Sequence, residues 1–298
     1  MCALFSPKQK VAGSTPAASI FHFYSFPIHP RFGEMIKISS RENQKIIQAR
    51  KTRDGKDKNL IFVEGLRLAE EVLISNLKIR EIFCTEQFAI SGRGQAFLQD
   101  IHSNLLAEVS ENVFNSLADT KNSQGIIVIA EKPPADRIFL EQNLNSKKTP
   151  LVILLHRINN PSNLGAILRT AEAVDAAGII LTKNSADAFS PKALRGAMGA
   201  AFRLPVWSNA DFSEALDWAK KYDLSAISAE ANAEKSYLEV DWKRPRLLIF
   251  GSEAHGLSAE EREKVEESMT IPMENKVESL NLAVSCGVIL FEAKRQNL

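Results

Sequence analysis

The residues best suited to chemistry occur in three short motifs in the second half of the chain. The first motif reads Asn-Asn-Pro-Ser-Asn-Leu-Gly-Ala-Ile-Leu-Arg-Thr-Ala from residue 159, after an apolar run, and contains Asn163 and Arg169. We expect a helix that Ser162 or Asn163 caps and Gly178 ends. The amino-terminal turn of such a helix favours an anionic ligand such as phosphate, and Arg169, nearly two turns on, could project to the same side. A capped structural helix with a solvated arginine is the alternative.

The second motif is an apolar run that ends in a glycine-containing loop, Leu-Leu-Ile-Phe-Gly-Ser-Glu-Ala-His-Gly over 247–256. Gly251 and Gly256 allow a tight turn and a close approach of backbone to a ligand. The carboxyl end of a parallel strand is where such a sheet binds its ligands. The loop matches neither the P-loop, which binds nucleotide phosphates, nor the dinucleotide fingerprint. The motif alone therefore does not identify a ligand.

The third motif comprises Ile-Pro-Met over 271–273 and Glu-Ser-Leu-Asn-Leu-Ala over 278–283, ahead of a long amphipathic run. Ser279 and Asn281 fall at the expected start of that helix, where each suits capping or contact with a ligand. Structural capping is the default interpretation of this motif taken alone.

Two α/β domains are expected to position these motifs. In the first, apolar periodicity indicates helices at 41–53, 65–76, 94–103 and 111–119 and strands at 60–63, 79–84 and 125–130. We place this domain at 35–132. The polar, proline-bounded stretch 133–149 is interpreted as a linker.

The second domain, 150–298, alternates strands with helices. Strands are expected at 151–155, 178–182, 224–229, 246–250 and 269–272, and helices at 163–177, 191–201, 211–222, 258–267 and 279–296. This alternation predicts an α/β fold with a mostly parallel sheet covered on both faces.

Composition limits the class of protein. The chain has 298 residues, of which 45% are hydrophobic and 24% charged, enough for two ordinary domains. Its three cysteines, Cys2, Cys84 and Cys286, lie far apart, which indicates neither a disulfide framework nor a cysteine zinc site and suits a reducing cytoplasm. A net charge of +1 excludes a globally basic nucleic-acid binder. No apolar stretch is long enough for a membrane helix.

The first 34 residues have no acidic residue before Glu34 and show no periodicity. A transit peptide is one interpretation, but no arginine-rich amphipathic helix is visible, and a secretory signal lacks its apolar core. We favour a third interpretation, in which translation begins at Met35. The segment 1–34 would then be a disordered or spurious extension.

The three motifs, in this order and at these separations, resemble those of the SpoU (TrmH-like) RNA methyltransferases over roughly 150–296. The resemblance implies a trefoil knot near the carboxyl end, S-adenosylmethionine as cofactor, a homodimer and methylation of a ribose 2′-hydroxyl. It implies catalytic or orienting roles for Arg169, Asn163, Glu253, Ser279 and Asn281. It implies a cofactor pocket formed by Ala229, Ala231, Phe250, Gly251, Gly256, Ile271, Met273, Leu280 and Ala283. A guanidinium is protonated essentially always, so we expect Arg169 to stabilise charge or hold a phosphate rather than act as a base.

The first domain, with Phe-Val-Glu-Gly-Leu-Arg-Leu-Ala-Glu-Glu over 62–71, resembles the ribosomal-protein-L30e-like substrate-binding domain of many family members. Residues 41–58 carry seven Lys or Arg against three Asp or Glu, a run that is also typical of a solvated helix face. The RNA contacts that we expect are Arg41, Lys45, Arg50, Lys51 and Arg53, with Lys192 and Arg195 from the family-like segment 190–199. The histidines, including His156 and His255, show no metal-binding spacing, so no metal is expected.

Ribosomal RNA is favoured over transfer RNA as the substrate, because a separate L30e-like domain precedes the catalytic one. The main rival hypothesis is a non-catalytic RNA-binding assembly factor with the same fold, which the intact Asn163, Arg169 and Asn281 argue against. A nucleotide-binding oxidoreductase is a second rival, disfavoured because no dinucleotide fingerprint follows any strand.

Overall fold

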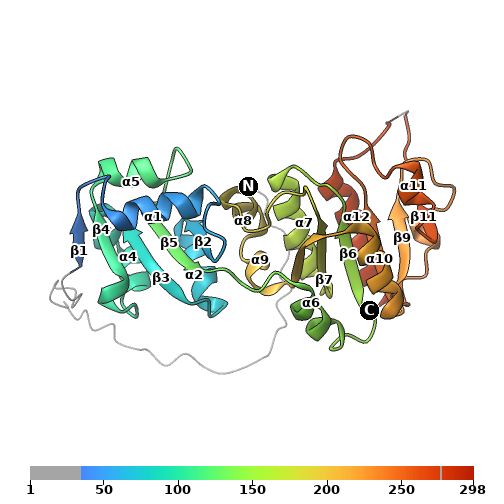
Figure 1. Ribbon diagram of the computed structural model, residues 1–298, viewed down its shortest axis with the longest axis horizontal. Coiled ribbons are helices and arrows are strands. Elements are labelled where there is room, and N and C mark those ends of the chain that lie inside the picture. Colours follow the sequence, from blue (N-terminus) through green and yellow to red (C-terminus); the bar gives the residue numbers. More distant parts are fainter. Residues whose placement is uncertain (1–34, 276) are drawn as a thin grey trace, which may run out of the picture. The chain divides into compact units, whose positions relative to one another are not determined.

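The computed structural model describes residues 35–275 and 277–298, which form two β-sheets with their covering helices (Figure 1). The expectations for residues 1–34 lie outside the described residues. The first sheet has five strands in the order β1-β4-β3-β5-β2. Their bounds are β1 Ile36–Ile38, β2 Leu60–Glu64, β3 Ile79–Cys84, β4 Leu106–Val109 and β5 Ile126–Glu131. Strands β1, β4 and β3 are parallel, and β5 is antiparallel to both of its neighbours.

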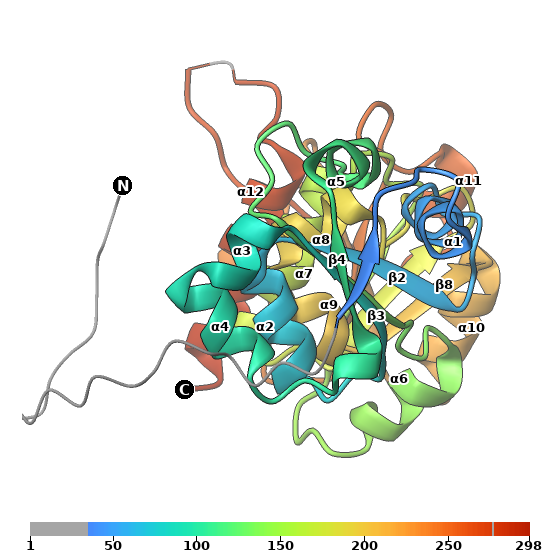
Figure 2. The same ribbon diagram turned by 90° about the vertical axis from the view of Figure 1, so that its left-hand side faces the viewer.

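Helices cover both faces of this sheet (Figure 2). They are α1 Gln44–Arg53, α2 Leu66–Ile74, α3 Glu86–Ile90, α4 Gly92–Leu98 and α5 Glu111–Leu117, with a short 3₁₀ turn η1 at Ser103–Leu105. Successive side chains of a strand point to opposite faces. Phe62 of β2 therefore packs with α1 and α5, whereas its neighbours Ile61 and Val63 pack with α2, α3 and α4.

Two strands and one α-helix of this part were not predicted from the sequence. Strands β1 and β4 were not expected, and neither was α3, which directly precedes α4. The helix expected at 94–103 is the shorter α4, which begins at Gly92 because the Ser91 hydroxyl accepts a hydrogen bond from the Gly94 N–H. β1 and β4 have only three and four residues, too few for a clear alternation.

The stretch interpreted as a linker contains a helix, α6, at Arg137–Leu144. Asp136 caps it by accepting a hydrogen bond from the Phe139 N–H at 3.0 Å. Leu140 and Leu144, one turn apart, are both buried in a hydrophobic cluster with the second sheet. The helix was not predicted because the stretch is mostly polar, and its two buried leucines are too few for a clear apolar periodicity.

The second sheet has six strands, all parallel, in the order β11-β9-β10-β6-β7-β8. Their bounds are β6 Leu151–Leu155, β7 Gly178–Thr182, β8 Val206–Ala210, β9 Ser225–Ala229, β10 Arg246–Phe250 and β11 Glu267–Met269. The parallel α/β sheet expected from the sequence is confirmed, although β8 was not anticipated. β11 ends at Met269 rather than covering the expected 269–272.

Alternate side chains of these strands pack on different helices. One face contacts α7 Pro161–Ala173, α8 Pro191–Ala197, α9 Ala200–Arg203 and α12 Leu282–Gln296; the other contacts α6 and α10 Phe212–Lys221. Thus Leu248 and Phe250 of β10 face the first set, and Leu247 and Ile249 face the second. The expected cover on both faces is confirmed. The short α11 Ala259–Arg262 and the 3₁₀ turn η2 Tyr237–Glu239 lie in the connections that flank β10.

The ends of two functional helices differ in how well they were predicted. Asn160, not Ser162 or Asn163, caps α7, because its side chain accepts from the Ser162 N–H. The helix ends at Ala173, with Val174 as its C-cap, and Gly178 belongs to β7. Asn281 is the cap of α12, as the sequence suggested, and accepts from the N–H groups of Ala283 and Val284.

Candidate active site

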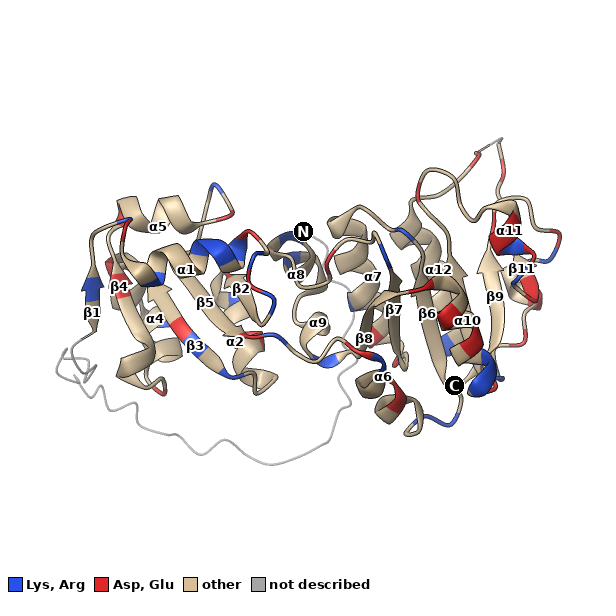
Figure 3. Ribbon diagram, viewed as in Figure 1, with Lys and Arg blue, Asp and Glu red and all other residues tan. Residues whose placement is uncertain are grey.

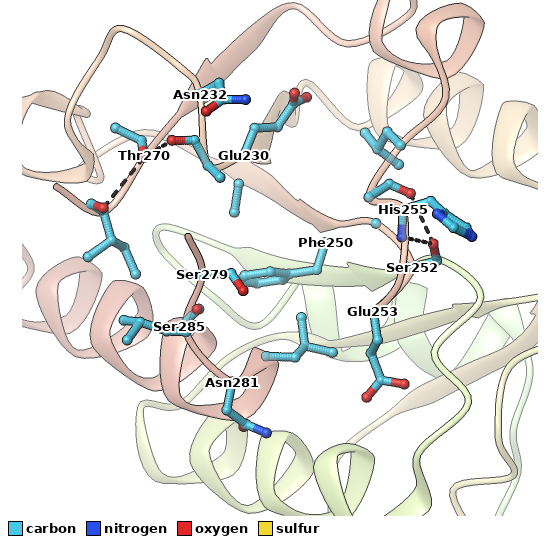
Figure 4. Close-up of a pocket in the computed structure, with 18 of the residues that line it drawn as sticks. Glu230, Asn232, Phe250, Ser252, Glu253, His255, Thr270, Ser279, Asn281 and Ser285 are labelled. Carbon is cyan, nitrogen blue, oxygen red and sulfur yellow. Dashed lines mark hydrogen bonds between the residues drawn. The ribbon is translucent and has the colours of Figure 1, made fainter. Parts of the chain in front are cut away.

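A pocket of about 550 Å³ lies where β9, β10 and β11 end (Figure 4). The three strand ends meet because Ala229 is in register with both Phe250 and Met269. The pocket contains most of the site residues predicted from the sequence. These are Asn163, Ala229, Ala231, Phe250, Gly251, Glu253, Gly256, Ile271, Met273, Ser279, Leu280 and Asn281.

A tight loop after β10 forms one wall of the pocket. The backbone N–H of Ser252 donates to the Gly256 carbonyl at 3.0 Å, and the Gly256 N–H donates back to the Ser252 carbonyl at 2.9 Å. A Cβ atom on Gly251 would lie 2.2 Å from the Gly256 carbonyl carbon, so only glycine fits there. Gly256 has φ +64° but open space around it. The two glycines therefore serve different purposes, close packing and backbone conformation.

Glu253 in this loop binds the start of the first motif. Its Oε2 accepts hydrogen bonds from the backbone N–H groups of Asn159 at 3.3 Å and Asn160 at 3.2 Å. Its Oε1 accepts from the side-chain amide of Asn163 at 2.5 Å. Because both carboxylate oxygens are engaged, Glu253 fixes the first motif against the second.

Asn281 joins the third motif to the other two. Its Nδ2 donates to Oδ1 of Asn163 at 3.1 Å, while its own Oδ1 caps α12. Asn163 thus connects Glu253 and Asn281 through one amide group. Ser279, two residues before Asn281, is exposed and also lines the pocket.

Two charged residues of the pocket were missed by the sequence analysis. Glu230 follows β9 directly and forms an ion pair with Arg262 of α11, with Oε2 and Nε 2.9 Å apart. The Ser228 hydroxyl donates to Oε1 of Glu230 at 2.8 Å. Glu230 could have been found from its position, since it directly follows the expected strand 224–229 and a parallel sheet binds its ligands at the carboxyl ends of its strands. Arg262 lies in a charged run without a distinguishing pattern.

The remaining side chains that line the pocket were also outside the predicted set. They are Asn232, Ser252, Ala254, His255, Leu257, Met269, Thr270, Leu282, Ser285 and Ile289. The Thr270 hydroxyl donates to the Ala231 carbonyl at 3.0 Å, which holds the segment after β9 against the segment after β11. The pocket therefore combines apolar surface with polar groups that face one another across it.

A buried histidine lies beside the site. His156 follows β6, is 3% exposed, and has its Nδ1 3.1 Å from the Thr182 hydroxyl and its Nε2 3.0 Å from Oε1 of Glu261. Burial lowers the pKa of His156, with a further contribution from Arg157 and opposition from Glu261. For Glu261, burial acts to raise the pKa, but hydrogen bonds from Ser258 and the charge of His156 outweigh it and lower the pKa. Both ring nitrogens of His156 therefore lie within 3.1 Å of polar side chains of the protein.

Two predicted site residues lie outside the pocket. Arg169 is exposed on α7, and within the described part of the chain it has neither an ion pair nor a hydrogen bond through its side chain. Ala283 donates its backbone N–H to Asn281, and its side chain packs against the hydrophobic core. Ala283 is therefore part of the helix cap rather than of the pocket wall.

Most of the basic residues expected to bind RNA have partners within the first sheet and its helices. Figure 3 marks the Lys and Arg positions along the ribbon, including those of α1, in blue. Lys45 forms an ion pair with Glu81 at 2.5 Å, and Arg53 donates to the carbonyls of Ser116 and Leu117. Arg50 donates to the Ser116 hydroxyl and the Arg41 carbonyl, and Arg41 donates to Asn112. Lys51 is exposed and has no ion-pair partner in the described residues. These contacts give four of the five residues a structural role, and their contact with RNA stays a prediction.

The two remaining basic candidates lie on α8. Lys192 is exposed, whereas Arg195 is half-buried and pairs with Asp119 at 2.7 Å. Neither lines the pocket.

Within residues 35–275 and 277–298 there is no group of His, Cys, Asp or Glu side chains arranged to hold a metal ion. Over the same residues no helix is long and apolar enough to cross a membrane.

Comparison with known proteins yields consistent matches. Residues 150–291 match the SpoU rRNA methylase family, and residues 41–128 match the MRM3-like substrate binding domain. An uncharacterized tRNA/rRNA methyltransferase of Synechocystis sp. is 31% identical over 275 residues, covering 90% of this chain and 97% of the relative. The 23S rRNA (guanosine(2553)-2′-O)-methyltransferase RlmP of Bacillus subtilis is 27% identical over 263 residues, covering 87% of this chain and 100% of the relative.

A solved structure also matches. The AdoMet-bound rRNA methyltransferase from Sinorhizobium meliloti has a TM-score of 0.75 and 27% sequence identity, covering 89% of this chain and 100% of that one.

Proposed function

The chain belongs to the SpoU rRNA methylase family, and we propose that it methylates a ribose 2′-hydroxyl of ribosomal RNA with S-adenosylmethionine as cofactor. The observation that carries this proposal is the hydrogen-bonded chain Glu253–Asn163–Asn281, which joins all three motifs at one pocket. Of the similar proteins above, two are named as methyltransferases of ribosomal RNA and one as an uncharacterized tRNA/rRNA methyltransferase.

The pocket fits this cofactor in size and chemistry. Its 550 Å³ falls within the range of about 300–1,000 Å³ for sites of small molecules. Phe250, Ile271 and Leu280 offer apolar contacts for a flat heteroaromatic base. The charged pair Glu230 and Arg262 offers partners for an ammonium and a carboxylate. When bound, S-adenosylmethionine supplies an electrophilic methyl group on a positively charged sulfur.

The residues of this chain orient the acceptor. A bond forms between the ribose oxygen and the methyl carbon, the carbon–sulfur bond breaks, and the hydroxyl proton leaves to water. Placement of the hydroxyl contributes much of the reduction in barrier, and the amides of Asn163 and Asn281 are fixed for that purpose. A guanidinium is too weak an acid to serve as a base, so we assign Arg169 to stabilising the developing negative oxygen or the adjacent phosphate. Glu253 holds the loop after β10 against the start of α7.

The roles that we propose for the separate parts of the chain rest on the two family matches. We propose that residues 35–132 bind the RNA substrate, that 133–149 connect the two parts, and that 150–298 carry out the transfer. Lys51 and Lys192 are exposed and, within the described residues, make no side-chain hydrogen bond or ion pair, so they are the first to test. Arg41 is exposed as well, but its side chain donates to Asn112. Transfer RNA remains the alternative substrate, because one relative is named for both RNAs.

We infer that the cofactor binds within a trefoil knot. The segment between β9 and β10 contacts both the residue after β11 and the end of α12. Thr270 exchanges backbone hydrogen bonds with Lys235 and Tyr237, and the side chain of Gln296 donates to the Val240 carbonyl. A chain that passes through such a loop before forming α12 would be knotted there.

We also infer a homodimer that buries α12. Val284 and Phe291, two turns apart on this helix, are 52% and 56% exposed. Residues seven apart lie on the same face of a helix. Sedimentation analysis should show a dimer that Phe291→Asp dissociates. Ile138→Asp, at another exposed apolar position, should leave the dimer intact.

One experiment tests the proposed function. The purified protein is incubated with labelled S-adenosylmethionine and total RNA from a strain that lacks the gene, and the labelled nucleotide is mapped. We expect label on a ribose 2′-oxygen of ribosomal RNA. Absence of transfer, or label only on transfer RNA or on a base, contradicts the proposal.

Arg169→Ala should lower the transfer rate by about 100-fold or more, consistent with the loss of one charge-stabilising group. Binding of the cofactor, measured by calorimetry, should change less than about twofold because Arg169 does not line the pocket. Arg244→Ala is the matched control, since this exposed arginine precedes β10 at the opposite edge of the sheet. Equal losses in the two variants would refute the role given to Arg169.

A further inference from the structure

A second pocket, of about 270 Å³, lies at one edge of the first sheet. It forms where β3 ends and β5 begins, because Cys84 and Ile126 are antiparallel partners. The turn into α3, the helix α5 and the residues before β5 surround it. The buried side chains of Phe88 and Phe114 lie at its floor.

Gly125 is required for this pocket to form. It has φ +78°, and a Cβ atom there would lie 2.6 Å from the Thr85 hydroxyl and 3.0 Å from Cβ of Phe88. The Thr85 N–H donates to the Gly125 carbonyl at 3.0 Å. The loop before β5 is thereby held directly against the turn into α3, which fixes two walls relative to one another.

Several polar groups around this pocket lack hydrogen-bond partners among the described residues. The Ser123 hydroxyl is buried without a partner. The Gln124 side chain accepts a hydrogen bond from the Leu66 N–H through Oε1, which leaves its NH₂ group free. The side chains of Gln87, Asn115 and Glu111 are exposed, and none makes a hydrogen bond or ion pair within the described chain. Buried polar groups are normally paired, so the Ser123 hydroxyl is available to a ligand or a water in the pocket.

The chemistry of the lining favours a nucleobase over a phosphate. No Lys or Arg lines the pocket, so it has no cation for a phosphate. Amide groups at the rim can both donate to and accept from the edge of a base, and one carboxylate accepts only. Its volume lies below the range of about 300–1,000 Å³ for sites of larger ligands, which suits a single base. Sequence-specific recognition of RNA usually reads bases that are unstacked and unpaired.

We propose that this pocket takes one unpaired guanine of the RNA substrate. Guanine presents two adjacent donors, N1–H and N2–H, that a single carboxylate can accept together, and Glu111 is the one carboxylate of the lining. The amides of Asn115 and Gln124 then donate to its O6 and N7 acceptors. The inference rests on the proposed function, since it assumes that RNA is the substrate.

The test uses the full chain and four fluorescent ten-nucleotide RNAs, composed of uridine with a central guanosine, inosine, adenosine or cytidine. Fluorescence anisotropy gives each dissociation constant. Inosine lacks only the 2-amino group, so the RNA with guanosine should bind about tenfold more tightly than the RNA with inosine. Glu111→Gln should abolish this preference, because the amide cannot accept both protons.

Glu86→Gln is the matched control. Glu86 and Glu111 are each the first residue of a short helix, α3 and α5, but only Glu111 lines the pocket. The two substitutions remove the same charge at equivalent helical positions. Glu86→Gln should therefore retain the tenfold preference for guanosine.

The inference is overturned if the wild-type protein binds all four RNAs equally, or if Glu111→Gln keeps the preference. It is also overturned if Glu86→Gln loses the preference to the same extent. Methyl transfer to total RNA, measured in parallel, separates this result from the proposed function. Methyl transfer without a preference for guanosine refutes the guanine-binding role of the pocket alone. A preference for guanosine without methyl transfer refutes the proposed enzymatic activity alone.

Discussion

The side-chain amide of Asn281 donates a hydrogen bond to Oδ1 of Asn163 at 3.1 Å, which joins residues 118 positions apart in the sequence. The other end of the Asn163 amide donates to Glu253. An amide has both a donor and an acceptor, so a single asparagine can connect an acceptor on one side with a donor on the other. An aspartate in place of Asn163 would present an acceptor to both neighbours. The relationship explains why amides and one carboxylate occupy these three positions.

Asn281→Asp should separate the two tasks of Asn281. Aspartate caps a helix about as well as asparagine, so the cap of α12 and the melting temperature should be nearly unchanged. The second carboxylate oxygen would repel Oδ1 of Asn163 and release it. We expect a loss of about tenfold in kcat, the size of one hydrogen bond to a catalytic group.

Asn281→Ala serves as the comparison, because it removes both the cap and the donor. It should lose activity and also about 1 kcal/mol in the free energy of unfolding. If Asn281→Asp is fully active in single-turnover assays, the bond to Asn163 has no part in catalysis.

Glu253→Gln should impair the transfer step by leaving one of the donors around the carboxylate unsatisfied. Glutamine has a single acceptor oxygen, whereas Glu253 accepts from two backbone N–H groups and from Asn163. We expect kcat to fall by about 10- to 100-fold, in line with a lost charge-assisted hydrogen bond. Glu274→Gln, an exposed carboxylate that does not line the pocket, should retain wild-type kcat. Equal rates for the two variants would contradict the role of Glu253.

Gly251→Ala should abolish binding of the cofactor. The added Cβ would lie 2.2 Å from the Gly256 carbonyl carbon and 2.5 Å from the Leu257 nitrogen, so the loop that lines the pocket must move. Gly256→Ala has open space and should cost only about 1–2 kcal/mol of stability for its left-handed backbone. Isothermal titration with S-adenosylmethionine measures the affinity of each variant for the cofactor, and urea unfolding measures the stability of each. Wild-type affinity in Gly251→Ala would show that this loop does not form the binding site.

The strand ends and the three motifs could be predicted because each depends on local sequence. Gly251, Asn163 and Asn281 follow or open apolar runs whose periodicity indicates a strand or a helix. The partnership between Glu230 and Arg262 could not be predicted, because it depends on where α11 packs. Ala283 was misplaced for a similar reason. The family resemblance implied that Ala283 lines the pocket, whereas the direction of the first helical turn places its side chain against the core.

The basic residues of α1 illustrate a second limit. Their number indicated a surface for RNA, yet Lys45, Arg50 and Arg53 contact side chains and carbonyls of other elements. A count of charges cannot distinguish a cation that faces solvent from one that closes a helix against a strand. Whether a cation is available to RNA depends on its contacts with residues far away in the sequence.

His156 should make the folded protein sensitive to acid. Burial lowers the pKa of His156 in the folded protein. Below about pH 6.5, the imidazole is therefore protonated more readily in the unfolded chain than in the folded one. The free energy of unfolding is therefore highest above that pH and falls as the pH drops. Glu261 opposes this effect and Arg157 adds to it. Urea unfolding between pH 8 and pH 5 measures the slope.

His156→Gln removes the titrating ring but keeps a side chain able to hydrogen-bond with Thr182 or Glu261. Its free energy of unfolding should be lower than that of the wild type at pH 8 but should depend less on pH between 6.5 and 5. His102→Gln, which replaces an exposed histidine, should keep the slope of the wild type. A slope in His156→Gln as steep as that of the wild type would mean that other groups cause the acid sensitivity. A shallower slope assigns it to the buried imidazole beside the active site.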